Sequence, residues 1–181
     1  LHDADAATPQ APDWPVVTNR VPENGAPWLR ARAWYVVDED TGKVVSAKNA
    51  DKPLPIASIT KLATAMIWAD ADVAEDREMR LTQADKEFMQ ITRSRLRVGG
   101  TYRVHDLYYS ALLASDNRAA LLLAKSTDLP LPAFIAAANR RMKALGLDSI
   151  VIDDPTGLSD ANVATARDVA RLLAVAAAHP V

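Results

Sequence analysis

The sequence contains no cysteine among its 181 residues. Disulfide bonds, thiol catalysis and cysteine-ligated zinc are therefore excluded, although the lack of cysteine does not identify the compartment. The three histidines, His2, His105 and His179, lie far apart and are not flanked by acidic ligands at metal-binding spacing. We expect each to be an ordinary surface or core residue, and we expect no metal site.

Long hydrophobic runs and a strong net charge are also missing. No apolar run reaches the roughly 18 residues that a membrane-spanning helix needs, so we expect no transmembrane segment. A net charge of −2 gives no general attraction to nucleic acid or to anionic membranes. Aromatic residues are only 6% of the chain, while 49% of all residues are hydrophobic and alanine is abundant. This composition favours one helix-rich domain with a sizeable core.

The chain divides into a short arm and one domain. Residues 1–27 hold five prolines and develop neither a helical nor a strand period, which predicts an extended, poorly ordered N-terminal arm. Trp14 and Trp28 are the residues that would attach parts of it to the body. Residues 28–181 form the expected domain. The sequence begins at Leu1 rather than Met, which fits either removal of an export signal or a trimmed chain.

The domain begins with strands and continues mainly as helices. Aromatic and β-branched residues on both sides of an Asp-Glu-Asp-Thr-Gly turn predict a hairpin over residues 32–47. Residues 58–72 favour a helix that is apolar almost all round, which indicates a buried helix. Residues 75–104 are charged and irregular, with a short strand near residue 80 and a Gly-Gly turn. Further helices are expected over residues 105–113, 117–125, 131–145 and 165–178, the last beginning with a capping box at Thr165 and Asp168.

Ser58 and Lys61 form the first candidate motif. They are three residues apart at the start of the buried helix, so their side chains share a face and lie within reach of each other. Burial, together with the positive end of the helix dipole, would lower the pKa of the amine until it can accept the serine proton. The motif alone is weak, because 8 serines and 7 lysines give about 0.3 such pairs per chain by chance.

Ser115, Asp116 and Asn117 form the second, rarer motif, with a chance expectation of about 0.03 per chain. These residue types suit a helix N-cap, and capping is compatible with a catalytic role. Ser115 can pass a proton between an amine and a leaving group, and Asn117 can hold a peptide backbone through its amide. The two motifs follow each other about 57 residues apart, an arrangement that chance explains poorly.

These motifs resemble the first two signatures of penicillin-binding proteins and class A β-lactamases. Three surrounding stretches narrow the resemblance to the low-molecular-mass D-alanyl-D-alanine peptidases, and among them to the penicillin-binding protein 7 type of murein endopeptidase. The stretches are residues 56–62, residues 114–120, and residues 155–159 together with 162–168. The resemblance covers about residues 30–178. It implies an α/β (α+β) fold of the β-lactamase/transpeptidase type, with a helical region and an incomplete antiparallel sheet.

The resemblance also implies the chemistry. Such a peptidase acts outside the cytoplasm, periplasmic or extracytoplasmic in a bacterium, on peptidoglycan stem peptides or cross-links. Ser58 would attack the carbonyl after a D-alanine and form an acyl-enzyme, with Lys61 as base, Ser115 as proton relay and Asn117 as substrate-binding residue. β-Lactam antibiotics would acylate the same serine as inhibitors. The family needs no cofactor, and neither a metal nor nucleic acid is expected.

The third signature of the family, Lys-Thr/Ser-Gly on a strand beside the serine, is absent. Lys125-Ser126-Thr127 is the nearest string, but it lacks the glycine and follows a predicted helix. The predicted hairpin is the only part of the family's sheet that is present. We favour the interpretation that the C-terminal remainder exists as a separate segment of the same protein, over a deliberate truncation or a natural short form that binds without catalysis.

Three other functions compete with the peptidase. A β-lactamase is disfavoured, because class A enzymes place a glutamate after the Ser-Asp-Asn motif, and the last glutamate here is Glu87. A non-catalytic peptidoglycan-binding or regulatory module would explain the missing third motif. A generic helical scaffold leaves the pairing of the two motifs unexplained. The sequence does not distinguish carboxypeptidase from endopeptidase activity.

Overall fold

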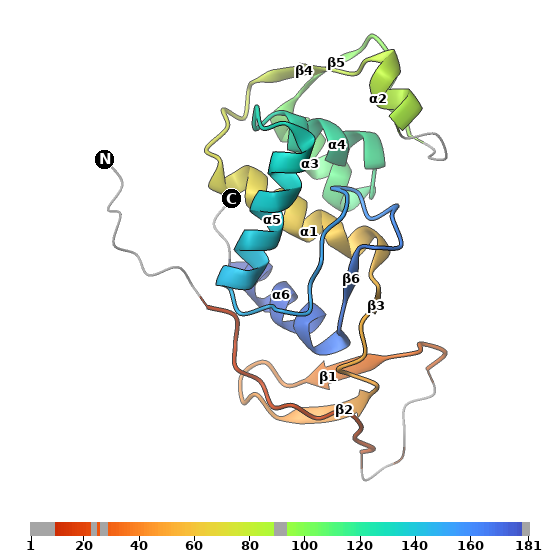
Figure 1. Ribbon diagram of the computed structural model, residues 1–181, viewed down its shortest axis with the longest axis vertical. Helices are drawn as coiled ribbons and strands as arrows, with labels where there is room; N and C mark the ends of the chain where they lie inside the picture. Colours follow the sequence, from red (N-terminus) through yellow and green to blue (C-terminus); the bar gives the residue numbers. More distant parts are fainter. Residues whose placement is uncertain (1–9, 23–24, 26–28, 89–93, 179–181) are drawn as a thin grey trace, which may run out of the picture.

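The computed structural model describes residues 10–22, 25, 29–88 and 94–178. A β-hairpin lies at one end of the molecule, a small lobe with α2, β4 and β5 lies at the other, and the remaining helices fill the space between them (Figure 1). The helices are α1 (Thr60–Asp70), α2 (Gln83–Phe88), α3 (Val104–Leu113), α4 (Asn117–Lys125), α5 (Leu131–Ala144) and α6 (Ala166–Ala178). The strands are β1 (Trp34–Val37), β2 (Val44–Lys48), β3 (Leu54–Pro55), β4 (Glu78–Arg80), β5 (Thr101–Arg103) and β6 (Val163–Ala164).

The strands form three separate antiparallel pairs in the described part of the chain. The predicted hairpin is confirmed as β1 and β2, with Trp34 opposite Lys48 and Tyr35 opposite Ala47. The other pairs, β3 with β6 and β4 with β5, are only two and three residues long on each strand. The alanine-rich face of α6 packs against the hairpin. Among the described strands, β1 has a partner only in β2, so its other edge is free.

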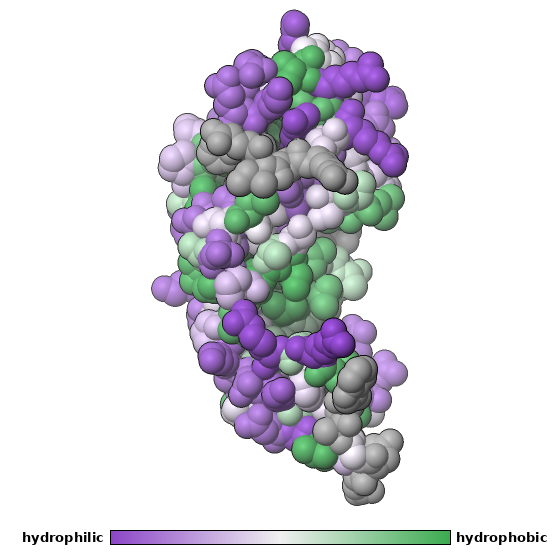
Figure 2. Space-filling model, turned by 90° about the vertical axis from the view of Figure 1, so that its right-hand side faces the viewer, coloured by the Kyte–Doolittle hydropathy of each residue, from purple (hydrophilic) through white to green (hydrophobic). Residues whose placement is uncertain are grey.

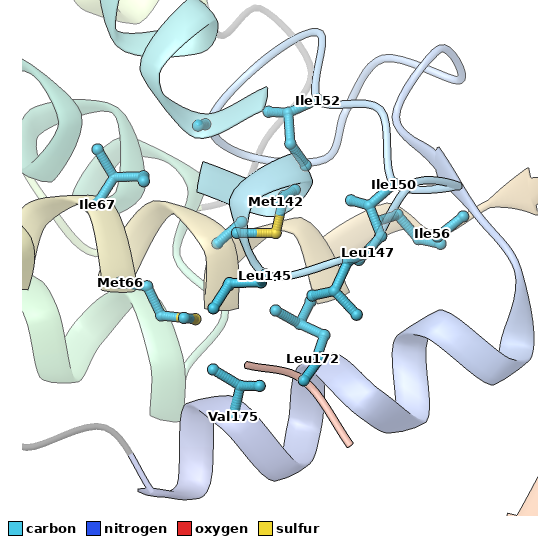
Figure 3. Close-up of a cluster of buried hydrophobic side chains, with 14 of the residues drawn as sticks. Ile56, Met66, Ile67, Met142, Leu145, Leu147, Ile150, Ile152, Leu172 and Val175 are labelled. Atoms are coloured by element: carbon cyan, nitrogen blue, oxygen red, sulfur yellow. The ribbon is translucent and has the colours of Figure 1, made fainter. Parts of the chain in front are cut away.

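The main core lies where α1, α5 and α6 meet. Figure 3 shows Met66 and Ile67 of α1 facing the same interior as Met142 of α5 and Leu172 and Val175 of α6. The predicted burial of α1 is confirmed, because eight of its eleven residues are buried. The buried residues include polar as well as apolar ones. Polar residues inside a helix of this kind need partners from other elements, and those partners form the candidate site described below.

The structure differs from the prediction for residues 75–104, which contain the unexpected helix α2. Thr82 and Asp85 cap it reciprocally. The carboxylate of Asp85 accepts a hydrogen bond from the Thr82 backbone N–H at 2.9 Å, and the Thr82 hydroxyl accepts one from the Asp85 N–H at 3.2 Å. Asp85 also forms an ion pair of 2.6 Å with Lys125 at the end of α4. A Thr-x-x-Asp pattern was the available signal for this helix.

The expectation of a loose N-terminal arm is wrong for residues 10–20. The arm is extended, but it packs against the body, and its Trp14 side chain is 8% exposed. The Arg171 guanidinium donates to the Pro12 carbonyl at 2.6 Å and the Tyr35 hydroxyl to the Pro15 carbonyl at 2.7 Å. Arg20 then pairs with the outer edge of β2. Trp28 lies outside the described residues, and the domain boundary at residues 27 and 28 stays a prediction.

Replacing Trp14 by alanine should destabilise the fold by about 3 kcal/mol, because it removes a large buried side chain from between the arm and the hairpin. Val16→Ala is the matched control, since Val16 belongs to the same arm and is 70% exposed. Urea unfolding followed by circular dichroism measures both. Equal free energies of unfolding for the two variants would show that the arm does not contribute to the core.

Candidate active site

Ser58 lies at the point where an extended segment becomes the buried helix α1. Two prolines, Pro53 and Pro55, keep the preceding segment extended, and Pro55 ends β3. A short 3-10 turn, Ala57–Ile59, then leads directly into α1. Ala57 has φ of 47°, a left-handed conformation that is uncommon for a residue with a side chain. This turn leaves Ser58 exposed at the surface while the next helical residues enter the core.

Lys61 is buried at 2% exposure one turn after Ser58. Its Nζ atom lies 3.0 Å from Ser58 Oγ, 2.5 Å from Asn117 Oδ1 and 2.7 Å from the Thr156 carbonyl oxygen. Two of these partners, the amide oxygen and the carbonyl oxygen, can only accept hydrogen bonds, whereas the serine hydroxyl can also donate. A neutral amine therefore gives its two N–H groups to the two acceptors and turns its lone pair toward the serine proton.

The protonation of Lys61 follows from its burial. Burial lowers the pKa of this amine from its usual 10.5 to about 8, while the carboxylates of Asp154 and Asp116 act in the opposite direction and raise it. At pH 7 about a tenth of the molecules then carry a neutral lysine, compared with about three in ten thousand for an ordinary lysine. The predicted decrease in pKa is therefore confirmed, and burial is its main cause.

The three residues of the Ser115-Asp116-Asn117 motif have different structural roles. Asp116 is 8% exposed and is the N-cap of α4, where its carboxylate accepts hydrogen bonds from the N–H groups of Arg118 and Ala119 at 2.9 and 3.1 Å. The cap fixes Asn117 as the first residue of α4, with its side chain on Lys61. Ser115 is exposed, has φ of 52°, and makes no side-chain hydrogen bond within the described residues. The structure thus brings Ser58, Lys61 and Asn117 together, with Ser115 nearby in the chain but unbonded.

Asp154 is a residue that the sequence analysis missed. Its carboxylate accepts hydrogen bonds from the backbone N–H groups of Thr156, Gly157 and Ser159 at 2.6, 3.0 and 2.7 Å, and from the amide of Asn162 at 2.6 Å. Burial alone would raise its pKa, but the hydrogen bonds outweigh burial and lower it, so the group stays a carboxylate. Asp154 thereby holds the loop whose Thr156 carbonyl contacts Lys61.

Two further contacts hold this loop against the start of α1. The Thr64 hydroxyl donates to the Pro155 carbonyl at 2.7 Å, and the Ile56 N–H donates to the carbonyl of the fully buried Asn162 at 3.0 Å. Gly157 lies so close to the serine turn that a Cβ atom there would be 1.9 Å from the carbonyl oxygen of Ala57. Pro155, Gly157 and Asn162 were noticed in the sequence only through the family resemblance, and no local pattern indicates their contacts.

The expected capping box of the last helix forms only in part. The Thr165 hydroxyl accepts a hydrogen bond from the Asp168 N–H at 3.2 Å, as expected. The Asp168 carboxylate does not return to Thr165. It accepts hydrogen bonds from Ser149 and forms an ion pair with Arg171 at 2.8 Å. Ser149, from the preceding loop, accepts the hydrogen bond from the Thr165 N–H at 3.1 Å in its place.

An apolar hollow of about 390 Å³ opens directly beside the serine turn. Ala57 and Ile59, on either side of Ser58, line it together with side chains from β1, β3 and α6. Leu173 on its wall is 51% exposed. Figure 2 shows a green patch in the middle of the face that it draws, with hydrophilic residues directly below the patch. An exposed apolar patch of this kind usually marks a surface that another element covers.

Two other motifs have structural roles. Lys125 and Ser126 lie at the C-terminal end of α4, where Lys125 pairs with Asp85 and the Ser126 hydroxyl donates to the Leu123 carbonyl at 2.7 Å. They therefore do not replace the missing Lys-Thr-Gly strand. His105 is half exposed, and its ring centroid lies 4.8 Å from that of Tyr109, with the two rings tilted by 60°. His2 and His179 lie outside the described residues. The described part contains no group of three potential metal ligands and no helix long and apolar enough to span a membrane.

The pattern of the family described as D-alanyl-D-alanine carboxypeptidase matches residues 20–180. The chain belongs to this family. The D-alanyl-D-alanine endopeptidase of Pseudomonas aeruginosa is 40% identical over 152 residues, which are 84% of this chain and 49% of that relative. The D-alanyl-D-alanine endopeptidase of Escherichia coli is 35% identical over 174 residues, 96% of this chain and 56% of the relative. The chain thus spans about half the length of the curated family members it matches.

Solved structures of the family agree with the fold. A variant of the DD-transpeptidase of Streptomyces K15 superposes with a TM-score of 0.77 at 26% identity, over 84% of this chain and 63% of that chain. A D-alanyl-D-alanine carboxypeptidase of Mycobacterium tuberculosis, at 24% identity, gives a TM-score of 0.72. The predicted α+β fold of the transpeptidase type, with its incomplete sheet, is confirmed.

The pH dependence of acylation should report the pKa of Lys61. Because only the neutral amine accepts the serine proton, the rate of acylation by a penicillin should rise with pH and level off above about 8. In Asp154→Asn the midpoint should lie at lower pH, since a charge that raises the lysine pKa is gone. Stopped-flow rates from pH 5.5 to 9.5 test this. A flat profile, or one still rising at pH 9.5, would contradict the assignment of Lys61 as base.

Proposed function

We propose that this chain carries the nucleophile and the base of a serine peptidase that cleaves the bond after D-alanine in peptidoglycan peptides. The observation that supports this most strongly is the pairing of the exposed Ser58 hydroxyl with the buried Lys61 amine at 3.0 Å. The pKa of about 8 keeps a useful fraction of that amine neutral near pH 7. Family membership supports the substrate class.

In the proposed reaction, the Ser58 hydroxyl gives its proton to Lys61 as Oγ attacks the carbonyl carbon after D-alanine. The oxyanion lies near the start of α1, where the backbone N–H of Ser58 and the helix dipole can stabilise it. When the C–N bond breaks, the proton passes from the lysine ammonium through Ser115 to the leaving amine. The amide of Asn117 orients the peptide. Water then hydrolyses the ester and restores the serine.

We further propose that another segment of the same protein covers the apolar hollow and completes the sheet on the free edge of β1. Three observations support this: the hollow touches both neighbours of Ser58, the edge of β1 has no described partner, and two curated relatives are about twice as long as the matched part. An edge strand of this kind is a template for another strand. The segment would supply the Lys-Thr-Gly motif and the contacts to the substrate carboxylate. It would thus raise the affinity for the peptide substrate, while the Ser58–Lys61 pair would still carry out the reaction.

Two curated relatives are named endopeptidases, so we propose cross-linked peptides as the preferred substrate. Because peptidoglycan lies outside the cytoplasmic membrane, the protein would act there, with its export signal removed. Incubation with a purified cross-linked muropeptide dimer and with a monomeric pentapeptide, followed by mass spectrometry, tests this. Conversion of the dimer to monomers by the wild type and not by Ser58→Ala is expected. Release of free D-alanine alone would indicate a carboxypeptidase.

The absence of the third motif gives one specific reason for a second candidate, a non-catalytic peptidoglycan-binding module. The same incubation separates the two functions. A folded protein that binds the dimer but leaves both substrates intact would support the binding module and contradict the peptidase. β-Lactam hydrolysis faster than peptide cleavage would instead support a β-lactamase.

A further inference from the structure

One side of α3 carries ring-shaped and apolar side chains that remain exposed to solvent. His105, Tyr109 and Leu113 follow one another at every fourth position, so they lie along the same side of the helix. Tyr109 is 47% exposed, and Leu113, at 83%, is the most exposed large hydrophobic residue in the described part of the chain. The ring centroids of His105 and Tyr109 lie 4.8 Å apart. We call these three residues the α3 stripe.

The Tyr109 ring is held in place by its neighbours. It meets the Tyr108 ring edge to face, with the centroids 5.3 Å apart. Tyr108 in turn packs against the buried Trp68 of α1, at 5.1 Å between centroids. Because the Tyr109 ring is already oriented, a ligand that stacks on it removes little further side-chain entropy. The Tyr109 hydroxyl, which makes no hydrogen bond within the described residues, is available to the same ligand.

The C-terminal end of the α3 stripe lies next to the candidate active site. There α3 is joined directly to the start of α4, because the Asp116 N–H donates to the Ser110 carbonyl at 3.1 Å. The next residue, Asn117, contacts the buried lysine amine through its side chain at 2.5 Å. Leu113 is separated from Ser115 by one alanine, and all three of these residues are exposed. The stripe therefore ends beside the residue that is proposed as the proton relay.

The other end of the α3 stripe lies away from the nucleophile. Trp68, which Tyr108 contacts, follows Ser58 by ten residues, or about 15 Å along α1. From His105 to Leu113 the stripe itself spans about 12 Å. It is therefore a narrow track, one helix wide, that leads away from the active site. Protein partners usually need about 20–30 residues on each side of an interface, whereas a track of this width suits an extended polymer.

The surroundings of the α3 stripe are polar. Arg103 and Asp106, at the start of α3, form an exposed ion pair of 3.2 Å, and Ser110, which follows Tyr109 in the sequence, is half-buried. Sugar rings combine apolar C–H faces, which stack on aromatic rings, with a rim of hydroxyl and amide groups. A neutral sugar thus fits a surface that offers an oriented ring, an exposed leucine and hydrogen-bonding neighbours.

We propose that the α3 stripe binds sugar rings of the glycan strand that carries the peptidoglycan peptides, while the peptide itself occupies the site at Ser58. The inference rests on the proposed peptidase function and adds a carbohydrate-binding surface to it. Tyr109 stacks on the face of one sugar, and Leu113 contacts the part of the substrate nearest Ser115. Stacking on one oriented ring improves binding by about tenfold.

The test measures binding of chitotetraose, a soluble oligomer of N-acetylglucosamine, to the purified chain. In amide NMR spectra, the signals of residues 105–113 should shift as the sugar is added. Tyr109→Ala should weaken the binding by about tenfold, whereas Tyr109→Phe retains the ring and should bind nearly as tightly as the wild type. Leu129→Ala is the matched control for Leu113→Ala, because Leu129 is also an exposed leucine, at 40%, and lies before α5. Of these two variants, only Leu113→Ala should bind more weakly.

Three results would overturn the inference: no shifts in residues 105–113, equal binding by the wild type and Tyr109→Ala, or shifts only around the apolar hollow beside Ser58. A wild-type chain that sediments as a dimer, with Leu113→Ala sedimenting as a monomer, would also overturn it, because a second copy would then cover the stripe. Each of these results leaves the peptidase intact if the chain cleaves the muropeptide dimer. Binding through Tyr109 by a chain that cleaves no peptide would support the carbohydrate surface and contradict the peptidase.

Discussion

Replacing Lys61 by methionine should lower the rate of Ser58 acylation by about a thousandfold, the typical contribution of a general base. Methionine fills a similar volume and is compatible with a buried helix position, but it has no lone pair of comparable basicity. Within the part of the chain that the structure describes, the buried amine connects the serine with both Asn117 and the Thr156 carbonyl. The measurement is the second-order rate constant for labelling by a fluorescent penicillin.

Two controls distinguish loss of the base from loss of the fold. Lys61→Arg keeps a long cationic side chain, but a guanidinium does not lose its proton near pH 8, so this variant should be equally slow. Lys143→Met removes an exposed lysine from α5 and should label at the wild-type rate. A Lys61→Met or Lys61→Arg variant that labels within tenfold of the wild type would show that another group takes the proton.

Gly157→Ala should displace the loop that contains Gly157 from the serine turn and thereby disrupt the candidate active site. A Cβ atom at this position would lie 1.9 Å from the Ala57 carbonyl oxygen, 2.3 Å from the Ala57 carbonyl carbon and 3.0 Å from the Ser58 nitrogen. Because these are backbone atoms, the loop and the serine turn must move apart. Overpacking of this kind costs about 1–3 kcal/mol, in addition to about 1 kcal/mol for an alanine in the left-handed conformation. Acylation should fall by at least about a hundredfold as Ser58 shifts relative to Lys61.

The chain offers a matched control for this variant. Gly99 has φ of 84°, almost the same as the 85° of Gly157, but a Cβ atom there would meet nothing within 4 Å. Gly99→Ala thus carries the same backbone strain without the clash. It should lose about 1 kcal/mol of stability and keep its acylation rate. If both alanine variants label equally fast, the close approach of the loop to the serine turn is not important for the site.

The sequence predicted the parts of the site that depend on local spacing. Ser58 and Lys61 lie on one helix at a spacing that brings their side chains together, and Asp116 has a residue type that caps helices. The burial of α1 also followed from its apolar run. The sequence motif assigned Asn117 to substrate binding, and no local pattern indicated that its side chain would reach Lys61. That contact joins two helices and depends on how they pack.

Asp154 could not be found by the same reasoning. Its partners are backbone N–H groups of its own loop, and its effect on Lys61 operates between segments more than 90 residues apart in the sequence. The two-residue strands β3 and β6 are also too short to show an alternating pattern. The attachment of the N-terminal arm was underestimated because prolines predict extended backbone but do not indicate whether it packs. Trp14 was the one local sign in the described part of the arm that it packs against the body, and its side chain is buried against the hairpin.

The most direct test of the central claim is to label the purified chain with a fluorescent penicillin beside its Ser58→Ala variant, on a denaturing gel and by intact mass. The wild type should take up one penicillin, slowly if the covering segment is absent, because the Ser58–Lys61 pair is already assembled at 3.0 Å. The Ser58→Ala variant should take up none. Equal labelling of both proteins, or no labelling of a wild-type chain that circular dichroism shows to be folded, would contradict the assignment of Ser58 as the nucleophile.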